Sequence, residues 1–324
     1  MSKQEISIPS LATKITSEAA AYEYLEGLRW NGTTVCPHCG AMGTAYFLNP
    51  ANGSSRSTRT GSISERRVWK CKDCRKQFSV LTGTIFHGTK IPVRTWLFVI
   101  FEMCASKNGV SAREIERKYD LTAKSAWFVV HRIREAMKRE PMAGLLTGAV
   151  IVDETYIGGK PRNMHAKQRA ALGHMEHKTA VISLVHKESG EVRSEVVEPV
   201  TSKTLREAIE RNVVLADTVL HSDSHAGYVG VGKDMAGHQS VNHTVDEYVR
   251  GDVTTNHAEG YFSQLKRSID GTHHHVSAEH LPRYLAEFDY RFTTRHMNDA
   301  ERMSNVVGNS AGRRLTYKPI TAED

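Results

Sequence analysis

Hydrophobic positions divide this chain of 324 residues into a helical N-terminal half and a C-terminal half that mixes strands with helices. Residues 1–30 predict a short helical lead-in, and apolar side chains recur at helical spacing through residues 91–140. Between 147 and 296, short apolar runs alternate with amphipathic stretches, a pattern that indicates strands and helices. From 297 onward the sequence is polar and predicts no element.

Two helices with a tight break between them are predicted from residue 111 to about 139. Ser111 and Glu114 form a capping box for the first helix, and Thr122 can cap the second after the break "DLT". The second helix has an apolar stripe with its basic residues largely outside it. This layout is typical of a helix-turn-helix, although helical hairpins of no special function share it. Candidate DNA-binding residues on it are Lys124, Arg132 and Arg134.

Four of the five cysteines form two Cys-x-x-Cys pairs, "CPHC" at 36–39 and "CKDC" at 71–74. Two intervening residues let both thiolates turn toward one ion, and two such pairs complete a tetrahedral Zn²⁺ shell. Unrelated buried cysteines are the alternative, which the matching spacing disfavours. We therefore predict one structural zinc in a zinc ribbon, bound by Cys36, Cys39, Cys71 and Cys74. The long loop within the 31 residues between the pairs is a candidate insertion.

Acidic residues follow two apolar strands in the C-terminal half. Asp153 ends "AVIVD", and Asp223 ends "TVLHSD". Between them we predict a strand pair that turns at "KESGE", then the helix "SKTLREAIERNV". Strand, hairpin, helix, strand is the order of an RNase H-like core, in which the first and fourth strands are central neighbours. The two acids are therefore expected to meet.

A later helix, "NHAEGYFSQLKRSI" at 256–269, is expected to supply the third acid. Glu259 and Lys266 are seven residues apart and share a face of this helix, and Asn256 lies close to that face as a reserve ligand. Converging carboxylates repel one another unless cations lie between them. Asp153, Asp223 and Glu259 thus fit two Mg²⁺ or Mn²⁺ ions, with Lys266 placed to hold a DNA phosphate. The alternative for each single acid is a helix or turn cap.

Charge supports a nucleic-acid partner. The net charge is +7, and residues 66–139 carry 17 Lys and Arg against 6 Asp and Glu. A basic segment of this kind suggests a polyanion, although a solvated basic face is the alternative. No apolar stretch approaches the ~18 residues of a membrane span, and the N-terminus lacks the layout of a signal peptide. We expect no membrane association and a cytoplasmic location.

The chain resembles DDE transposases of bacterial insertion sequences, in the group with an N-terminal zinc ribbon. The matching text, in order, is "CPHCG", "CKDCRKQFSVLTGTIF", "VDETYIGGK", "HSDSHAGY", "NHAEGYFSQLKR" and "HLPRYLAEFDYRF". The resemblance implies an RNase H-like catalytic domain that cuts and joins DNA at element ends with two divalent metals. It also implies that Asp153, Asp223 and Glu259 are the metal-binding triad and Lys266 the basic residue that follows it.

These observations define an α+β multidomain protein. We predict a helical lead-in and zinc ribbon at 1–88, a helix-turn-helix segment at 89–146, an RNase H-like catalytic domain with a mixed central sheet at 147–296, and a polar tail at 297–324. Lys160, after the glycines of "YIGGK", is a further DNA-contact candidate. Glu154 receives no catalytic role, because side chains alternate across a strand. His221, His225 and His273–His275 stay outside the metal set.

The expected function is that of a transposase that binds terminal repeats and catalyses two-metal DNA cleavage and strand transfer. Two alternatives remain open at this point: a DNA-binding regulator whose catalytic domain has decayed, and a metal-dependent nuclease that cuts without joining. The expected partner is double-stranded DNA, as element ends and as target. Because transposition brings two ends together, a homo-oligomer on DNA is expected by mechanism.

Overall fold

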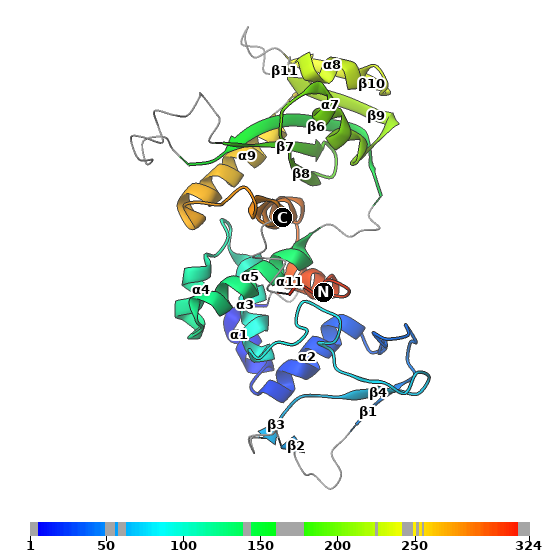
Figure 1. Cartoon of the computed structure of the whole chain (residues 1–324), viewed down its shortest axis with the longest axis vertical. Coiled ribbons are helices and arrows are strands. Elements are labelled where there is room, and N and C mark those ends of the chain that lie inside the picture. Colours follow the sequence, from blue (N-terminus) through cyan, green and yellow to red (C-terminus); the bar gives the residue numbers. More distant parts are fainter. Residues whose placement is uncertain are drawn as a thin grey trace. The chain divides into compact units, whose positions relative to one another are not determined.

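The computed structural model describes residues 6–48, 56–57, 63–138, 144–159, 178–223, 226–241, 249–250, 253–254 and 256–316 (Figure 1). The chain divides into two compact units. Unit 1 comprises Met1–Ser106, Val110–Met137 and Met297–Asp324, and unit 2 comprises Lys107–Gly109 and Lys138–His296. The C-terminal segment therefore returns to the unit formed by the N-terminal half.

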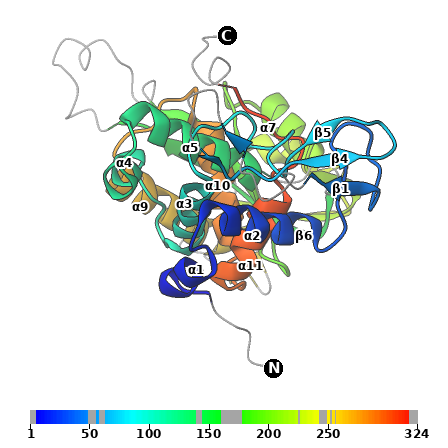
Figure 2. The same cartoon turned by 90° about the horizontal axis from the view of Figure 1, so that it is seen from below.

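Unit 1 is built around the apolar helix α3 (Val93–Ala105), in which eight of the thirteen side chains are buried. This helix contacts α1 (Ile8–Lys14), α2 (Glu18–Trp30), α5 (Ala123–Met137) and α11 (Asp299–Gly308), and Figure 2 shows α2, α3 and α11 alongside one another. Cys104 is 1% exposed on α3. α11 lies in the segment for which the polar sequence predicted no element. Its Asn298 cap and its buried Met303, Val306 and Val307 explain why it forms.

The helix-turn-helix prediction agrees with α4 (Ala112–Tyr119) and α5, which contact each other. Ser111 Oγ accepts from the Glu114 backbone N–H at 3.1 Å, and Thr122 Oγ1 accepts from that of Ser125 at 3.2 Å. Asp120, in the left-handed conformation with φ +50°, ends α4. Side-chain caps from Ser111 and Thr122 thus begin the two helices, as the sequence predicted, whereas the backbone of Asp120 ends the first.

The ribbon is a small antiparallel sheet of three described strands, β1 (Ala45–Phe47), β4 (Trp69–Cys71) and β5 (Gln77–Phe78), with β4 in the middle. Between the cysteine pairs the structure also describes the short strand pair β2 (Arg56–Ser57) and β3 (Ile63–Ser64). Glu26 of α2 connects the ribbon to the helices, because its carboxylate accepts from Trp69 Nε1 at 2.8 Å and from Arg67 Nε at 2.9 Å.

Unit 2 contains a mixed sheet of five described strands in the order β10-β9-β6-β7-β8. The strands are β6 (Leu146–Ile157), β7 (Thr179–His186), β8 (Val192–Val196), β9 (Val213–Asp223) and β10 (Gly237–Val241). β6 is antiparallel to β7 and parallel to β9, and α7 (Ser202–Glu210) lies between β8 and β9 in the chain. The first and fourth strands are thus neighbours, and the RNase H-like order predicted from the sequence is confirmed.

Each face of this sheet is covered by its own hydrophobic core. On one face, Val150 and Val152 of β6 pack with α7 and with α8 (Val229–Gly232). On the other, Ile151 and Ile157 pack with α9 (Asn256–Ser268) and α10 (Leu281–Thr293). Side chains alternate along a strand, so even-numbered positions of β6 near its centre face α7 and odd-numbered positions face α9.

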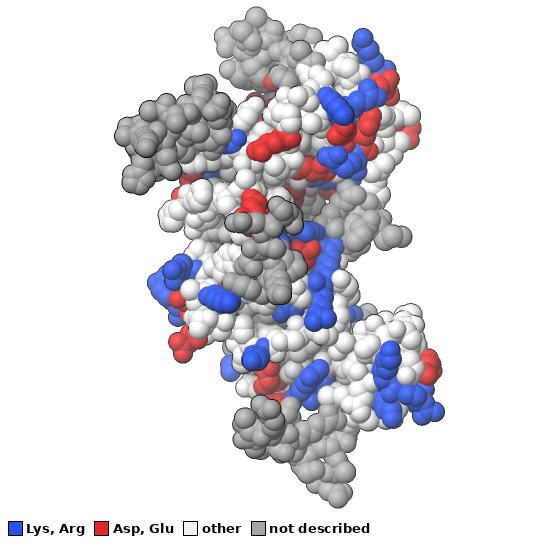
Figure 3. Space-filling model, in the orientation of Figure 1, with Lys and Arg blue, Asp and Glu red and all other residues white. Residues whose placement is uncertain are grey.

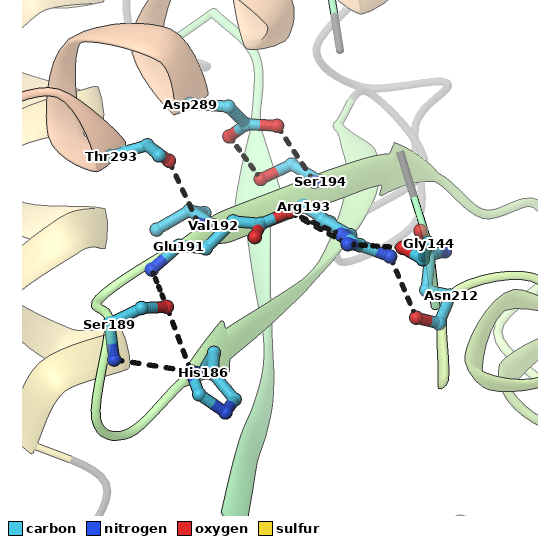
Figure 4. Close-up of polar contacts among 10 residues, drawn as sticks. All are labelled: Gly144, His186, Ser189, Glu191, Val192, Arg193, Ser194, Asn212, Asp289 and Thr293. Atoms are coloured by element: carbon cyan, nitrogen blue, oxygen red, sulfur yellow. Dashed lines mark hydrogen bonds and ion pairs between the residues drawn. The ribbon is translucent and has the colours of Figure 1, made fainter. Parts of the chain in front are cut away.

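Polar contacts attach α10 to the edge strand β8 (Figure 4). Asp289 accepts from the backbone N–H of Ser194 at 2.8 Å and from its hydroxyl at 2.7 Å, and Thr293 Oγ1 accepts from the Val192 N–H at 3.0 Å. Arg193 points the opposite way and donates to the carbonyl oxygens of Asn212 and Gly144. These contacts satisfy backbone groups of an edge strand, which otherwise lacks a pairing partner on one side.

One boundary differs from the prediction. β6 continues to Ile157, so Asp153 lies inside the strand rather than at its end. The reason is pairing with β7, which extends from Val150 to Ile157, whereas pairing with β9 stops at Ile151. Asp153 is therefore beyond the end of the β6–β9 ladder although it is still within β6.

Candidate zinc centre and acidic site

The four cysteines of the two pairs lie together in unit 1, and their sulfur atoms are all within 4.8 Å of one another. Cys36 Sγ is 3.7 Å from Cys74 Sγ, and Cys39 Sγ is 3.7 Å from Cys71 Sγ. Four sulfurs around one Zn²⁺ at ~2.3 Å are separated by roughly 3.8 Å in a regular tetrahedron. The observed spacing fits a closed four-thiolate zinc shell, in agreement with the prediction of one structural zinc.

The two cysteine pairs have similar backbone geometry. The Cys36 N–H donates to the Ala41 carbonyl at 2.9 Å, and the Cys71 N–H donates to the Lys76 carbonyl at 3.1 Å. The residue after each pair is left-handed, with φ +76° at Gly40 and +60° at Arg75. Backbone N–H groups of the second turn, first that of Cys74, lower the pKa of the Cys71 thiol to about 6. Such donors stabilise thiolate, the form that binds metal.

The first two acids are brought together by the register of β6 and β9. Ile151 is the partner of His221 in the parallel ladder, and Asp153 and Asp223 each lie two residues further along their strands. Both side chains therefore project from the same face, on the side that α9 covers. The Asp223 end of the strand is supported on its outer side by β10, where Val241 is its partner.

Glu259 is exposed in the first turn of α9. Ala258, Phe262 and Leu265 are the buried stripe that holds this helix against Ile151, so the helix starts beside the strand that carries Asp153. The Glu259 carboxylate is near enough to raise the pKa of Asp153 by repulsion. The structure thus brings together the three acids that the sequence singled out.

Asp153 is the carboxyl most affected by its surroundings. Burial is the main reason that its pKa rises to about 7, and repulsion from Asp223, Glu154 and Glu259 acts in the same direction. The Glu154 N–H donates to Asp153 Oδ1 at 2.8 Å and opposes the rise. Without cations the group would be partly protonated near neutral pH. Hard divalent ions with oxygen ligands, such as Mg²⁺, would offset this charge crowding.

Glu154 points to the other face of the sheet and approaches Tyr228, which is fully buried with α7 and α8. Burial and then the Glu154 carboxylate raise the pKa of the Tyr228 hydroxyl well above its usual value. Tyr228, the last residue of "HSDSHAGY", has no role predicted from the sequence. The available signal was a tyrosine five residues after Asp223, beside glycine.

The acids are not as close to one another as the cysteines are. Among the described residues, the four cysteines alone form a group of three or more metal-ligand side chains within 4.8 Å. Asn256 and Lys266 are both exposed on α9, at its first residue and two turns after Glu259.

The residues proposed from sequence to contact DNA are placed differently from one another. Lys124 is exposed at the start of α5. Arg132 and Arg134 are 2% and 1% exposed, so they do not lie on an open basic face of that helix. α3, α4 and α11 pack around α5 and bury more than the single stripe that its periodicity predicted. Lys160 lies outside the described residues.

Histidines left unassigned from the sequence are also placed. His221 is 4% exposed within β9. The His273 ring packs on Tyr284 and Phe288, with centroid distances of 4.9 and 5.9 Å. His274 and His275 are exposed, and His225 lies outside the described residues. None of the described histidines belongs to the cysteine cluster.

Comparison with known proteins gives two family matches. Residues 16–77 match the family described as "Transposase zinc-ribbon domain", and residues 145–293 match the "ISXO2-like transposase domain". Together they cover about two thirds of the chain. No described helix is long and apolar enough to cross a membrane.

A curated relative is described as "Uncharacterized protein in transposable element ISH50" from Halobacterium salinarum. It is 26% identical over 290 residues, which are 85% of this chain and 90% of the relative. Among solved structures, a simian T-cell lymphotropic virus intasome in complex with PP2A regulatory subunit B56 gamma is similar over 54% of this chain and 63% of that one, with 13% identity and a TM-score of 0.28. That score is too low to support an argument. By its two matched domains, the chain belongs to the insertion-sequence transposases in which a zinc ribbon precedes an ISXO2-like transposase domain.

Proposed function

We propose that this protein binds the terminal repeats of its insertion sequence and catalyses DNA cleavage and strand transfer with two Mg²⁺ or Mn²⁺ ions. The observation that carries the proposal is the convergence of Asp153, Asp223 and Glu259 on one face of the sheet in unit 2. Burial is the main cause of the raised pKa of Asp153, and repulsion from Asp223 and Glu259 adds to it. A pair of divalent cations would relieve that repulsion.

The three carboxylates would hold the cations, and Asn256 is placed one turn before Glu259 as a reserve ligand. When bound, the ions supply activation of a water or 3′-hydroxyl and stabilisation of the leaving oxygen. Lys266, exposed two turns further along α9, would bind a phosphate of the strand being cut. Because β6, β9 and α9 each have buried residues beside the acids, the ligands are attached to rigid elements.

The test is strand transfer on a duplex taken from the ends of the element that encodes this chain. Asp153→Asn, Asp223→Asn and Glu259→Gln should each lower metal-dependent joining by on the order of 10³-fold, since each removes a ligand worth several kcal/mol. DNA affinity should remain, because the unit with the zinc ribbon is unchanged. Asp217→Asn is a matched control: this acid is exposed on the same strand as Asp223.

The outcomes separate the alternatives. Joining that survives all three substitutions would refute the proposed triad. Wild-type protein that binds the ends but never cuts them is a regulator with a decayed catalytic domain. Protein that cuts without joining is a nuclease.

A further inference from the structure

A cavity of about 320 Å³ lies within unit 1, between α3, α5 and two loop segments. Its aromatic wall is Trp96 and Phe128, and its polar wall includes Lys90, Arg132 and Arg314. A second cavity of about 190 Å³ shares the segment His87–Thr89 with it and adds Arg66. Neither cavity contains any residue of the acidic site.

Arg132 is the unusual residue of this cavity. Its guanidinium group lies over the rings of Phe128 and Trp96, at 5.0 and 5.6 Å from their centroids, and one of its nitrogens donates to the His87 carbonyl at 2.8 Å. The Nε atom is buried and makes no hydrogen bond within the described part of the chain. No described carboxylate forms an ion pair with this side chain, although it is 98% buried. Burial of a cation without an anion is energetically costly. The cavity beside Arg132 has the volume and the positive charge to bind an anion.

Two more basic residues line the same cavity, and Arg66 lines the second one. Lys90 and Arg314 are exposed at the cavity, and no described acid pairs with either of them. Burial first, and then Arg314, Arg132 and Arg66, lower the pKa of His87. The positive potential at His87 therefore comes from basic residues of both cavities, Arg132 and Arg314 in the first and Arg66 in the second. His87 Nδ1 accepts from the Gly83 N–H at 3.0 Å, which leaves Nε2 to carry the proton of the neutral ring.

Arg314 reaches the cavity because the segment after α11 is bound to the N-terminal half. The Ile85 N–H donates to the Ser310 carbonyl at 3.2 Å, and the Gly312 N–H donates to the Gly83 carbonyl at 2.9 Å. Arg313 then donates to the Glu135 carbonyl of α5 at 2.6 Å. The basic cluster is thus assembled from four separate parts of the sequence, held by backbone contacts.

We propose that this cavity binds a phosphate of the DNA backbone, with Arg132 as its buried donor and Lys90 and Arg314 as exposed donors. Guanidinium groups match the geometry of phosphate oxygens, and exposed basic residues at the opening suit a ligand that continues outside. The site lies in the unit that carries the zinc ribbon. Figure 3 shows Lys and Arg side chains over the elements of this unit. The inference rests on the DNA-binding part of the proposed function and is independent of catalysis.

The experiment measures the affinity of the zinc-loaded full chain for an element-end duplex between about 50 and 200 mM KCl. Each protein–phosphate contact contributes about 0.9 to the slope of log affinity against log salt. Lys90→Gln and Arg314→Gln should each reduce that slope by about 0.9, so that the fall in affinity over this range becomes about 3.5-fold smaller. Arg132→Lys keeps the charge but loses the planar fork, and it should weaken binding at every salt concentration.

Lys14→Gln and Arg94→Gln are the matched controls, since both residues are exposed in unit 1 and neither lines a cavity described here. If the two cavity variants change the slope no more than these controls do, the proposal is overturned. It is also overturned if inorganic phosphate alone shifts the His87 ring resonances while the DNA slope is the same in all variants, because the cavity then takes a free anion. Loss of joining in Asp153→Asn, with the slope differences intact, would leave this inference standing on its own.

Discussion

Asp153 and Glu154 are adjacent acids with opposite surroundings. Asp153 faces α9 and the other two acids, whereas Glu154 faces the core under α7 and approaches Tyr228. Side chains of consecutive residues in a strand project from opposite faces of the sheet. Glu154 also supplies a backbone donor to Asp153, and we expect no ligand role for its side chain.

Substitution of Glu154 tests this division of roles. Glu154→Gln keeps the backbone donor to Asp153 and the polar neighbour of Tyr228, so joining activity should stay within about tenfold of wild type, against a loss of on the order of 10³-fold for Asp153→Asn. The comparison is made under single-turnover conditions with saturating Mg²⁺. Equal losses in the two variants would show that both acids bind metal.

The buried carboxyl of Asp289 predicts a pH dependence of stability. Burial is the main reason that its pKa rises from 3.8 to about 6, despite donors from Tyr261 and Ser194. The folded protein keeps a proton that the unfolded chain releases between about pH 4 and pH 6. The free energy of unfolding should therefore fall as pH rises through that window, by on the order of 3 kcal/mol from this group.

Asp289→Asn removes the titrating group and keeps an acceptor for Ser194. Amide hydrogen exchange of β8 and α10, followed from pH 4 to 7 after correction for intrinsic rates, should lose most of its pH dependence in this variant. An unchanged dependence would assign the effect to other carboxyls.

At the scale of elements, the contact between α2 and the ribbon depends on Glu26. Glu26→Ala leaves Trp69 Nε1 and Arg67 Nε without their acceptor, and it should lower the free energy of unfolding of unit 1 by about 2–4 kcal/mol. All four tryptophans of the chain, residues 30, 69, 96 and 127, belong to unit 1, so their fluorescence reports this unit selectively.

Glu23→Ala is the control for that measurement. Glu23 pairs with the same Arg67 at 2.7 Å, but its side chain is 62% exposed, against 8% for Glu26. An exposed pair of this kind contributes at most about 1 kcal/mol. Similar losses in both variants would mean that the charge of Arg67, rather than the buried acceptor, determines the effect.

At the scale of the whole molecule, zinc should be required by the ribbon and not by the sheet of unit 2, because that sheet has hydrophobic cores on both faces. Cys71→Ser should lose the metal and the amide protection of β1, β4 and β5, and leave that of β6 and β9 unchanged. Cys104→Ala, at a buried position on α3, should keep the zinc. Less than about half an equivalent of zinc in the wild type would contradict the four-thiolate centre.

Local signals were sufficient for most elements, for the four clustered cysteines and for the three acids that the structure brings together. Caps at Ser111 and Thr122, the repeated Cys-x-x-Cys spacing and the alternation of β6 depend on neighbours in sequence, so they can be read without a fold. The end of β6 could not be read, because it depends on which of two neighbouring strands continues to pair.

The sequence by itself therefore determined the order strand, hairpin, helix, strand of the central sheet, the four clustered cysteines and the three acids, because short-range spacing and periodicity encode them. Only the tertiary structure decided that Arg132 and Arg134 are buried, since a helical stripe reveals one packed face while α3, α4 and α11 together cover more of α5. It alone brought Arg314, from the polar segment after residue 297, to the cavity at His87. Contacts between residues far apart in the chain leave no periodic pattern, and charge alone does not distinguish a solvated arginine from a buried one.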